Sequence, residues 1–321
     1  MVYMLFDNPA DENNMGFLKN NEATSSYALV FPQEKCNSIK SMYKACKNAI
    51  ASSNEGDTLI FWYDLMGVIC QWYCKFFHKK RKIVILNILL KDKKTLKNRI
   101  AKFLYKHALK SPNVKATVTS VEYGEMVRKM LGINQEFILL HDIYYGNSQS
   151  DYSSDDKSVF CGGRNGRDWK FLFELAGEMP DVKFNVVLSS EQLEIYKDKI
   201  KDNINVKADI PMSEFLNIMS QSSLVALPID TEAPAGLIVM FQAASCGKMV
   251  ITSDTVTTRE YFGEQRGEMC KHEIVNWKEK IYYWLDHQEE SKKRAESFRS
   301  FLETECSRDK YAETLSSIVE S

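Results

Sequence analysis

The sequence has no run of about 18 apolar residues, the length that a membrane-spanning helix needs. Its first thirty residues also lack the apolar core of a secretion signal, because Asp7, Asp11 and Glu12 interrupt them. Neither membrane insertion nor secretion is therefore indicated, and we expect a cytoplasmic protein.

Metal-ligand spacing is absent as well. The eight cysteines form no pattern typical of metal sites, and the closest pair, Cys70 and Cys74, lies one helical turn apart in an apolar stretch. We interpret the cysteines as reduced core thiols and expect no metal. The chain is 44% hydrophobic and 26% charged, which is the composition of a soluble globular protein. Its 321 residues are enough for two domains.

Residues 1–146 alternate between predicted strands and helices, a pattern typical of a parallel sheet with helices on both faces. Ligands of such a doubly wound sheet gather at the carboxyl ends of its strands. Four polar residues are candidates for the acceptor side of a binding site: Asp7, Asn13, Asp64 and Asn87. Asp7, Asp64 and Asn87 are selected by their position at strand ends, and Asn13 lies in the loop expected at residues 7–16, after the first strand. Because Asn87 interrupts the apolar run of the strand predicted at 82–89, an internal hydrogen bond is the alternative interpretation for it.

A strongly basic stretch covers residues 75–115, with fourteen Lys or Arg against one acid, Asp92, a net charge of +13. Within it Leu96, Ile100, Phe103, Leu104 and Ala108 recur at helical spacing among lysines, the pattern of a basic amphipathic helix. A solvated face over an ordinary core and attachment to an anionic membrane both fit this pattern. Nucleic acid fits less well, because aromatic residues are not interleaved and the rest of the chain carries −14 to give the total of −1.

Residues 147–156 are polar, rich in Ser and Asp, and predict a linker between two domains. A short apolar run follows at Val159, then a glycine turn with Gly163, Arg164 and Arg167, then a helix beginning near Asp168. Arginine suits phosphate binding because its planar fork bonds two phosphate oxygens at once, although arginine pairs in turns are more often simply exposed.

The richest segment is residues 227–254, in which a strand end, a Pro/Gly loop, a helix and a second strand follow one another. Apolar residues recur at helical spacing until Gly247, where the helix can end in a left-handed residue. Ala235 and Gly236 have little or no side chain, so an anion can approach the first N–H groups of the helix, including that of Leu237. This suits a diphosphate.

The segment 234–251 resembles the donor site of the family 4 glycosyltransferases, which have the GT-B fold. In that family two glutamates, normally eight positions apart, hold the sugar and the ribose of the nucleotide. Here Gln242 stands at the position of the second glutamate and Pro234 at that of the first, with Glu232 two residues further back. The resemblance implies that Glu232 contacts the donor sugar and Gln242 the ribose.

The same resemblance extends over residues 157–285. It implies that Arg164 and Arg167 flank the donor diphosphate after Gly163, and that the loop at Pro211 contacts the base. It also implies two Rossmann-like α/β domains facing a cleft: an acceptor-side domain at 1–146 and a donor domain at 157–300. A C-terminal helix at 301–321 then returns to the first domain, and Phe301, Tyr311 and Leu315 are the apolar residues expected to carry it back.

The function implied by the resemblance is that of a retaining, metal-independent glycosyltransferase. It moves a sugar from a UDP- or GDP-sugar to a saccharide or lipid-linked saccharide acceptor, in surface polysaccharide synthesis, without a cofactor. A lipid-linked acceptor favours the membrane interpretation of residues 75–115, on the inner face of the cell membrane. Two alternatives remain: a nucleotide-sugar epimerase of the same fold, and a degenerate paralogue that assists an active transferase, which Gln242 suggests.

Overall fold

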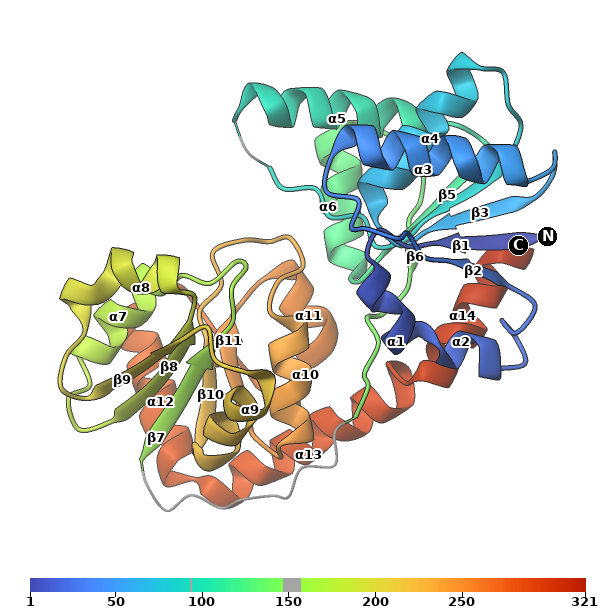
Figure 1. Cartoon of the computed structure of the whole chain (residues 1–321). Helices are drawn as coiled ribbons and strands as arrows, with labels where there is room; N and C mark the ends of the chain where they lie inside the picture. Colours follow the sequence, from blue (N-terminus) through green and yellow to red (C-terminus); the bar gives the residue numbers. More distant parts are fainter. Residues whose placement is uncertain (93, 147–156) are drawn as a thin grey trace. The chain divides into compact units, whose positions relative to one another are not determined.

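A computed structural model describes residues 1–92, 94–146 and 157–321 of the chain, which form two compact units (Figure 1). Unit 1 comprises Met1–Ile143 together with Cys306–Ser321, and unit 2 comprises Tyr144–Glu305. The predicted linker at 147–156 lies outside the described residues, as does Lys93 of the basic stretch.

Unit 1 is built on a parallel sheet, in which the six described strands run in the order β2-β1-β3-β4-β5-β6. The strands are β1 (Val2–Leu5), β2 (Ala28–Val30), β3 (Thr58–Phe61), β4 (Lys82–Ile85), β5 (Val114–Val118) and β6 (Ile138–Leu139). The helices are η1 (Pro9–Asp11), α1 (Glu12–Met15), α2 (Phe17–Asn20), α3 (Ile39–Ser52), α4 (Asp64–Phe76), α5 (Leu96–Leu109), α6 (Val121–Leu131) and α14 (Arg308–Glu320). The predicted doubly wound sheet is thus confirmed.

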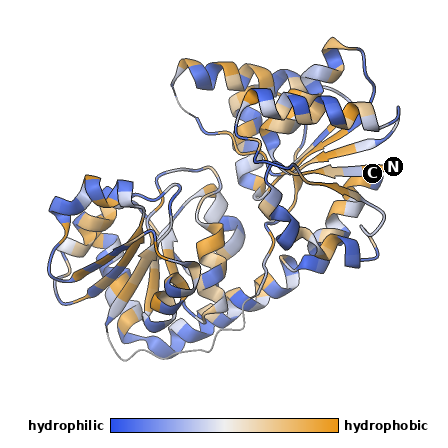
Figure 2. Cartoon of the chain, viewed as in Figure 1, coloured by the Kyte–Doolittle hydropathy of each residue, from blue (hydrophilic) through white to orange (hydrophobic). Residues whose placement is uncertain are grey.

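Unit 2 has a second parallel sheet, whose six described strands run in the order β12-β11-β10-β7-β8-β9. The strands are β7 (Ser158–Gly162), β8 (Lys183–Leu188), β9 (Ile204–Ala208), β10 (Leu224–Leu227), β11 (Val250–Ser253) and β12 (Glu268–Cys270). The helices are α7 (Trp169–Gly177), α8 (Ser190–Tyr196), η2 (Lys197–Lys199), α9 (Met212–Gln221), α10 (Leu237–Ser245), α11 (Val256–Phe262), α12 (Ile274–Asp286) and α13 (Gln288–Glu305). In both sheets the strands are predominantly hydrophobic, and the surrounding helices carry both hydrophobic and hydrophilic residues (Figure 2).

The end of the chain returns to unit 1, as the resemblance predicts, but in a different form. Two helices replace the single one expected at 301–321: α13 ends at Glu305, and Ser307 caps the start of α14. Tyr311 and Leu315 of α14 are buried in the core of unit 1. Phe301 instead belongs to unit 2, where its ring lies beneath the guanidinium of Arg266.

Two further expectations change locally. The predicted strand from Lys82 to Leu89 ends at Ile85, because Asn87 has a positive φ of 43° that an extended strand cannot continue. The loop expected after the first strand contains η1 and α1, and the Asn8 side chain caps η1. Within the described residues no helix is both long and apolar enough to cross a membrane.

Candidate functional site

The glycine turn after β7 depends on glycine at two positions. Gly163 and Gly166 have φ of 121° and 67°, values that residues with a side chain rarely adopt. A Cβ on Gly163 would lie 2.8 Å from Nη2 of Arg167, and one on Gly166 would lie 2.7 Å from Cβ of Ala235. The turn therefore comes into direct contact with the loop that precedes α10.

Backbone hydrogen bonds hold these two segments together. The N–H of Asp168 donates to the carbonyl of Pro228 at 3.0 Å, and the N–H of Asp230 donates to the carbonyl of Gly166 at 3.2 Å. Between these bonds, Arg167 and Ile229 form an antiparallel bridge. The two motifs that the sequence separates by some seventy residues are thus one structural unit at the carboxyl ends of β7 and β10.

Arg167 lies at the centre of this unit and is buried, with 6% of its surface exposed. Its Nε donates to the carbonyl of Gly162 at 2.9 Å, and its Nη1 donates to that of Asn165 at 3.3 Å. No carboxylate of the described residues forms an ion pair with it, and burial lowers the pKa of its guanidinium. Asp230 lies close enough for its charge to oppose this lowering, but it makes no ion pair with the guanidinium. A buried cation without a direct carboxylate contact is costly, so the arrangement favours an anionic ligand.

The amino end of α10 faces the same guanidinium. Gly236, the N-cap, has a φ of 85°, and a Cβ there would lie 3.0 Å from Nη1 of Arg167. It has no side chain with which to cap the helix, and the side chain of Leu237 is buried, so Leu237 offers only its backbone N–H. A cation and uncapped helix N–H groups therefore converge on one point, a combination that suits a phosphate group.

Arg164, unlike Arg167, is exposed and forms an ion pair with a carboxylate. Its side chain is 73% exposed, and its Nη2 forms an ion pair with Oδ1 of Asp209 at 3.1 Å. The other oxygen of Asp209 accepts hydrogen bonds from the N–H and hydroxyl of Ser190, and these bonds together with Arg164 hold the pKa of the Asp209 carboxyl below its usual value. Asp209 was not among the predicted residues, although its place directly after β9 is the positional signal that selected the candidates in unit 1.

The two predicted nucleoside-contacting positions lie on neighbouring helices. Pro211 is the exposed N-cap of α9, and Gln242 lies on α10. Nε2 of Gln242 is 3.3 Å from the sulfur of Met212, the residue that follows Pro211. The structure therefore brings these two predicted positions together in unit 2.

Glu232 has a partner of its own. Its Oε2 accepts a hydrogen bond from the N–H of Val256 at 2.9 Å, at the first residue of α11, and its carbonyl accepts one from the hydroxyl of Thr257. A carboxylate at that position compensates an otherwise unpaired helix N–H and the positive end of the helix dipole. The side chain is exposed, but in this conformation one of its oxygens supports the loop.

In unit 1, two of the four acceptor-side candidates make internal contacts. The buried carboxylate of Asp64 accepts the N–H groups of Leu65 and Leu89 at 2.7 and 2.8 Å, and the Tyr105 hydroxyl also bonds to it. Burial raises the pKa of Asp64 to about 6. Such a residue fixes the start of α4 against the segment after β4.

Asn87 is bonded within the same unit. Its N–H donates to the hydroxyl of Thr117, which donates in turn to Oδ1 of Asn87, and its Nδ2 donates to Oδ1 of Asp142 at 3.0 Å. Burial raises the pKa of Asp142 to about 6, against the effect of this bond. The internal hydrogen bond considered as the alternative for Asn87 is therefore present.

Asp7 and Asn13 are the more open candidates. Asp7 is half-buried after β1, and desolvation raises its pKa, while Asn13 is exposed on α1. Asp11, which was not predicted, lies close enough to Asp7 for their charges to interact, and burial followed by that repulsion raises its pKa. Among the described residues no group of three or more His, Cys, Asp or Glu could hold a metal ion.

The chain resembles known proteins in part of its sequence and in its fold. Residues 176–301 match the family described as "Glycosyl transferases group 1". Sucrose-phosphate synthase from Thermosynechococcus elongatus superposes with a TM-score of 0.78 at 13% identity, over 100% of this chain and 98% of that one. HepE from Anabaena, in complex with UDP and glucose, gives 0.72 at 12% identity over 99% of both chains.

A third similar structure is the pneumococcal O-GlcNAc transferase GtfA in complex with UDP and GlcNAc, with a TM-score of 0.61 at 14% identity over 87% of this chain and 59% of that one. At these identities the likenesses establish the fold. No curated protein sequence matches the chain. Residues 176–301 therefore carry the match to the group 1 glycosyltransferases, and the likenesses over the whole chain give it the GT-B fold.

Proposed function

We propose that this protein is a retaining glycosyltransferase that moves a sugar from a UDP- or GDP-sugar to a saccharide or lipid-linked saccharide, in the synthesis of surface polysaccharide. The observation that carries the proposal is the convergence of the unpaired, buried Arg167 with the uncapped amino end of α10 at Gly236. A diphosphate supplies the negative charge that this point lacks.

In the proposed reaction the bond between the sugar C1 and the diphosphate breaks, the acceptor hydroxyl oxygen bonds to C1 on the same face, and the hydroxyl proton passes to an oxygen of the leaving diphosphate. Negative charge then grows on the leaving diphosphate. In this proposal Arg167 and the N–H groups of Ala235 to Leu237 stabilise that charge, and Arg164 joins them by leaving Asp209. The chain's contribution is therefore mainly electrostatic.

The remaining site assignments belong to this proposal. Gln242 holds the ribose, the loop at Pro211 contacts the base, and Glu232 meets the donor sugar. Asp7 and Asn13 are the unit 1 residues left for the acceptor, because Asp64 and Asn87 are engaged internally. A lipid-linked acceptor would lie at the inner face of the cell membrane, and we propose that residues 75–115 meet its anionic surface.

The direct test begins with calorimetric titration of UDP, GDP and other nucleoside diphosphates, followed by incubation with the matching nucleotide sugars and a saccharide panel. We expect one diphosphate to bind and its sugar to be transferred with retained anomeric configuration, read by NMR. A new nucleotide sugar formed from donor alone would show the epimerase instead. No binding by any diphosphate would favour the degenerate paralogue.

Arg164→Ala sharpens this test. We expect turnover to fall on the order of 10²-fold, as when one preorganised charge contact to a transition state is removed. Lys170→Ala is the matched control, because Lys170 is equally exposed in the same unit and pairs only with Glu174 on its own helix. An Arg164→Ala turnover equal to that of the control would remove Arg164 from the site.

A further inference from the structure

The apolar stripe of α5 faces solvent. Leu96, Ile100 and Phe103 are 74%, 53% and 55% exposed, whereas the core side of the helix is formed by Tyr105, Ala108 and Leu109. The spacing of four and three residues places the exposed three along one side of the helix. Water therefore covers a ridge of apolar side chains roughly 10 Å long, at about 1.5 Å of rise per residue.

Basic residues flank this ridge on both sides. At 3.6 residues per turn, Arg99, Lys106 and Lys110 border it on one side and Lys97 on the other. Figure 2 shows the corresponding mixture of hydrophobic and hydrophilic residues along α5. Among the described residues of α5, Lys102, further round the helix, is the one that pairs with an acid, Asp92.

The carboxyl end of α4 extends the same surface. Trp72 stacks with Phe103 at 6.2 Å, and its indole donates to the carbonyl of Leu104. One turn further along α4, Phe76 is 77% exposed, and Lys75 lies 5.7 Å from the Trp72 ring while donating to the carbonyl of His107. Exposed aromatic and cationic side chains thus continue from α5 onto α4.

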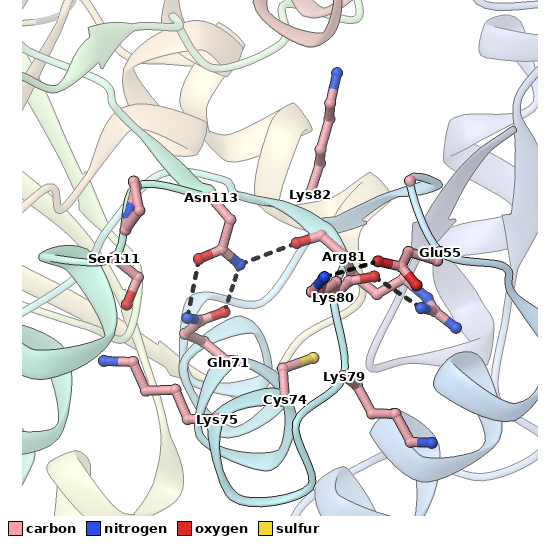
Figure 3. A pocket seen from close by; sticks show the side chains of 12 residues that line it. Glu55, Gln71, Cys74, Lys75, Lys79, Lys80, Arg81, Lys82, Ser111 and Asn113 are labelled. Carbon is pink, nitrogen blue, oxygen red and sulfur yellow. Dashed lines mark hydrogen bonds and ion pairs between the residues drawn. The ribbon is translucent and has the colours of Figure 1, made fainter.

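Beyond this end lies a hollow of about 500 Å³ whose lysines point in different directions (Figure 3). Gln71 and Asn113 bond to each other at its centre, while Lys75, Lys79 and Lys82 extend away from one another around them. Cations that diverge do not enclose a single small anion. They suit a surface with many separate negative charges.

We infer that α5 is a docking element that lies in the plane of an anionic lipid bilayer, with Leu96, Ile100 and Phe103 inserted and the flanking lysines on the headgroups. The chemistry of the surface selects this partner. A basic amphipathic helix gains both from apolar insertion and from anionic lipid, and the net charge of +13 over residues 75–115 provides the second contribution. A second copy presenting the same face would be repelled, and a nucleic acid leaves Leu96 and Ile100 of the ridge without a partner.

The inference gives the membrane partner in the proposed function a defined docking element, and it does not depend on the transfer reaction. It is tested by flotation of the full chain with vesicles of phosphatidylcholine alone or mixed with phosphatidylglycerol, without donor or acceptor. We expect binding to the mixed vesicles only, weakening as salt is raised. Loss of transferase activity with binding intact would count against the reaction alone, and the reverse against the docking element alone.

Two sets of variants separate the contributions. Leu96→Ser, Ile100→Ser and Phe103→Ser combined should lower partitioning on the order of tenfold or more. Each of Lys97→Gln and Lys106→Gln should lower it about fivefold, since a basic residue near an anionic surface contributes about 1 kcal/mol. Ile195→Ser with Val275→Ser is the control, because these residues are 60% and 66% exposed in unit 2. Circular dichroism verifies that every variant is folded.

Insertion is read directly with an environment-sensitive fluorophore on Ile100→Cys, because all eight native cysteines are buried. Its emission should shift to the blue on anionic vesicles, and the same label on Val275→Cys should not respond. Equal binding to neutral vesicles, no binding to either, or equal losses in the ridge and control variants would overturn the inference. So would tighter binding to a single-stranded oligonucleotide that the ridge substitutions leave unchanged.

Discussion

The carboxyl-terminal edges of the two sheets carry opposite kinds of polar residue. In unit 1 the edge holds Asp64 and Asn87, whose hydrogen bonds are satisfied by their own unit. In unit 2 the edge holds Arg167, a buried cation without a carboxylate partner among the described residues, beside a helix end that no side chain caps. Position at a strand end is common to both, so the difference shows that a ligand site also needs unsatisfied polar groups.

Among the variants proposed here, Arg167→Met should have the largest effect on turnover. We expect a loss of turnover of roughly 10²–10³-fold, because the group that meets the leaving diphosphate is removed. Affinity for the nucleoside diphosphate should fall in calorimetry, while that for the free nucleoside stays the same. Lys170→Met provides the control. Retained diphosphate affinity in Arg167→Met would mean that the guanidinium only braces the glycine turn.

Asp64→Asn tests the unit 1 edge through pH. The folded-state pKa of Asp64 is about 6, against an ordinary 3.8, so the folded state retains a proton that the unfolded chain loses between these values. The stability that protonated Asp64 contributes, on the order of 3 kcal/mol, should therefore be lost as pH rises from about 4 to 6. Urea unfolding across this range should show a correspondingly smaller slope in Asp64→Asn, with the slope from Asp142, also near 6, remaining.

The control for that experiment is Glu55→Gln, an exposed acid of unit 1 paired with Lys80. It should keep the full slope. In Asp64→Asn the amide NH2, a hydrogen-bond donor, faces a backbone N–H, which is also a donor. At pH 7 we therefore expect lower stability but unchanged diphosphate affinity in the folded variant. An unaltered slope in Asp64→Asn, or a loss of its diphosphate affinity, would contradict the distinction drawn between the carboxyl-terminal edges of the two sheets.

Glu232→Ala tests whether one residue of unit 2 can both hydrogen-bond within its own unit and contact the donor. If its carboxylate leaves Val256 to bond the donor sugar, turnover should fall about ten- to a hundredfold, since a bond involving a charged group contributes about 1.5–3 kcal/mol. Affinity for the free diphosphate should then be nearly intact. Equal losses of turnover and diphosphate affinity would show that Glu232 acts by supporting the loop.

Gln242→Ala should have the smallest effect. Losing one neutral hydrogen bond to a ribose costs about 0.5–1.5 kcal/mol of nucleotide affinity, about a two- to twelvefold increase in Kd. Gln242→Glu should restore or raise affinity, because a charged acceptor bonds a hydroxyl about twice as strongly. Calorimetry with the nucleoside and its diphosphate measures both variants. An unchanged Kd in Gln242→Ala would remove this residue from the nucleotide site.

The elements and their order could be predicted from the sequence, because these depend on neighbouring residues. The alternation of apolar runs predicts the parallel sheet of unit 1, and the resemblance implies that of unit 2. Asp168 marks the start of α7, and Gly247 has the left-handed conformation expected after α10. The two donor-side motifs were also evident, since glycine and arginine at those spacings are local signals. Only the reach of the predicted strand at Lys82 and the single final helix needed correction.

The partners that residues find far along the chain could not be predicted from the sequence, because they depend on how the elements pack. Arg164 and Arg167 are three residues apart, yet one is exposed and paired with Asp209 while the other is buried against Gly236. Likewise, the sequence shows that α5 is amphipathic. In the structure, however, Tyr105, Ala108 and Leu109 form its buried side, and the ridge of Leu96, Ile100 and Phe103 is exposed to solvent. Helical periodicity places residues on faces, and only packing against the sheet decides which face is buried.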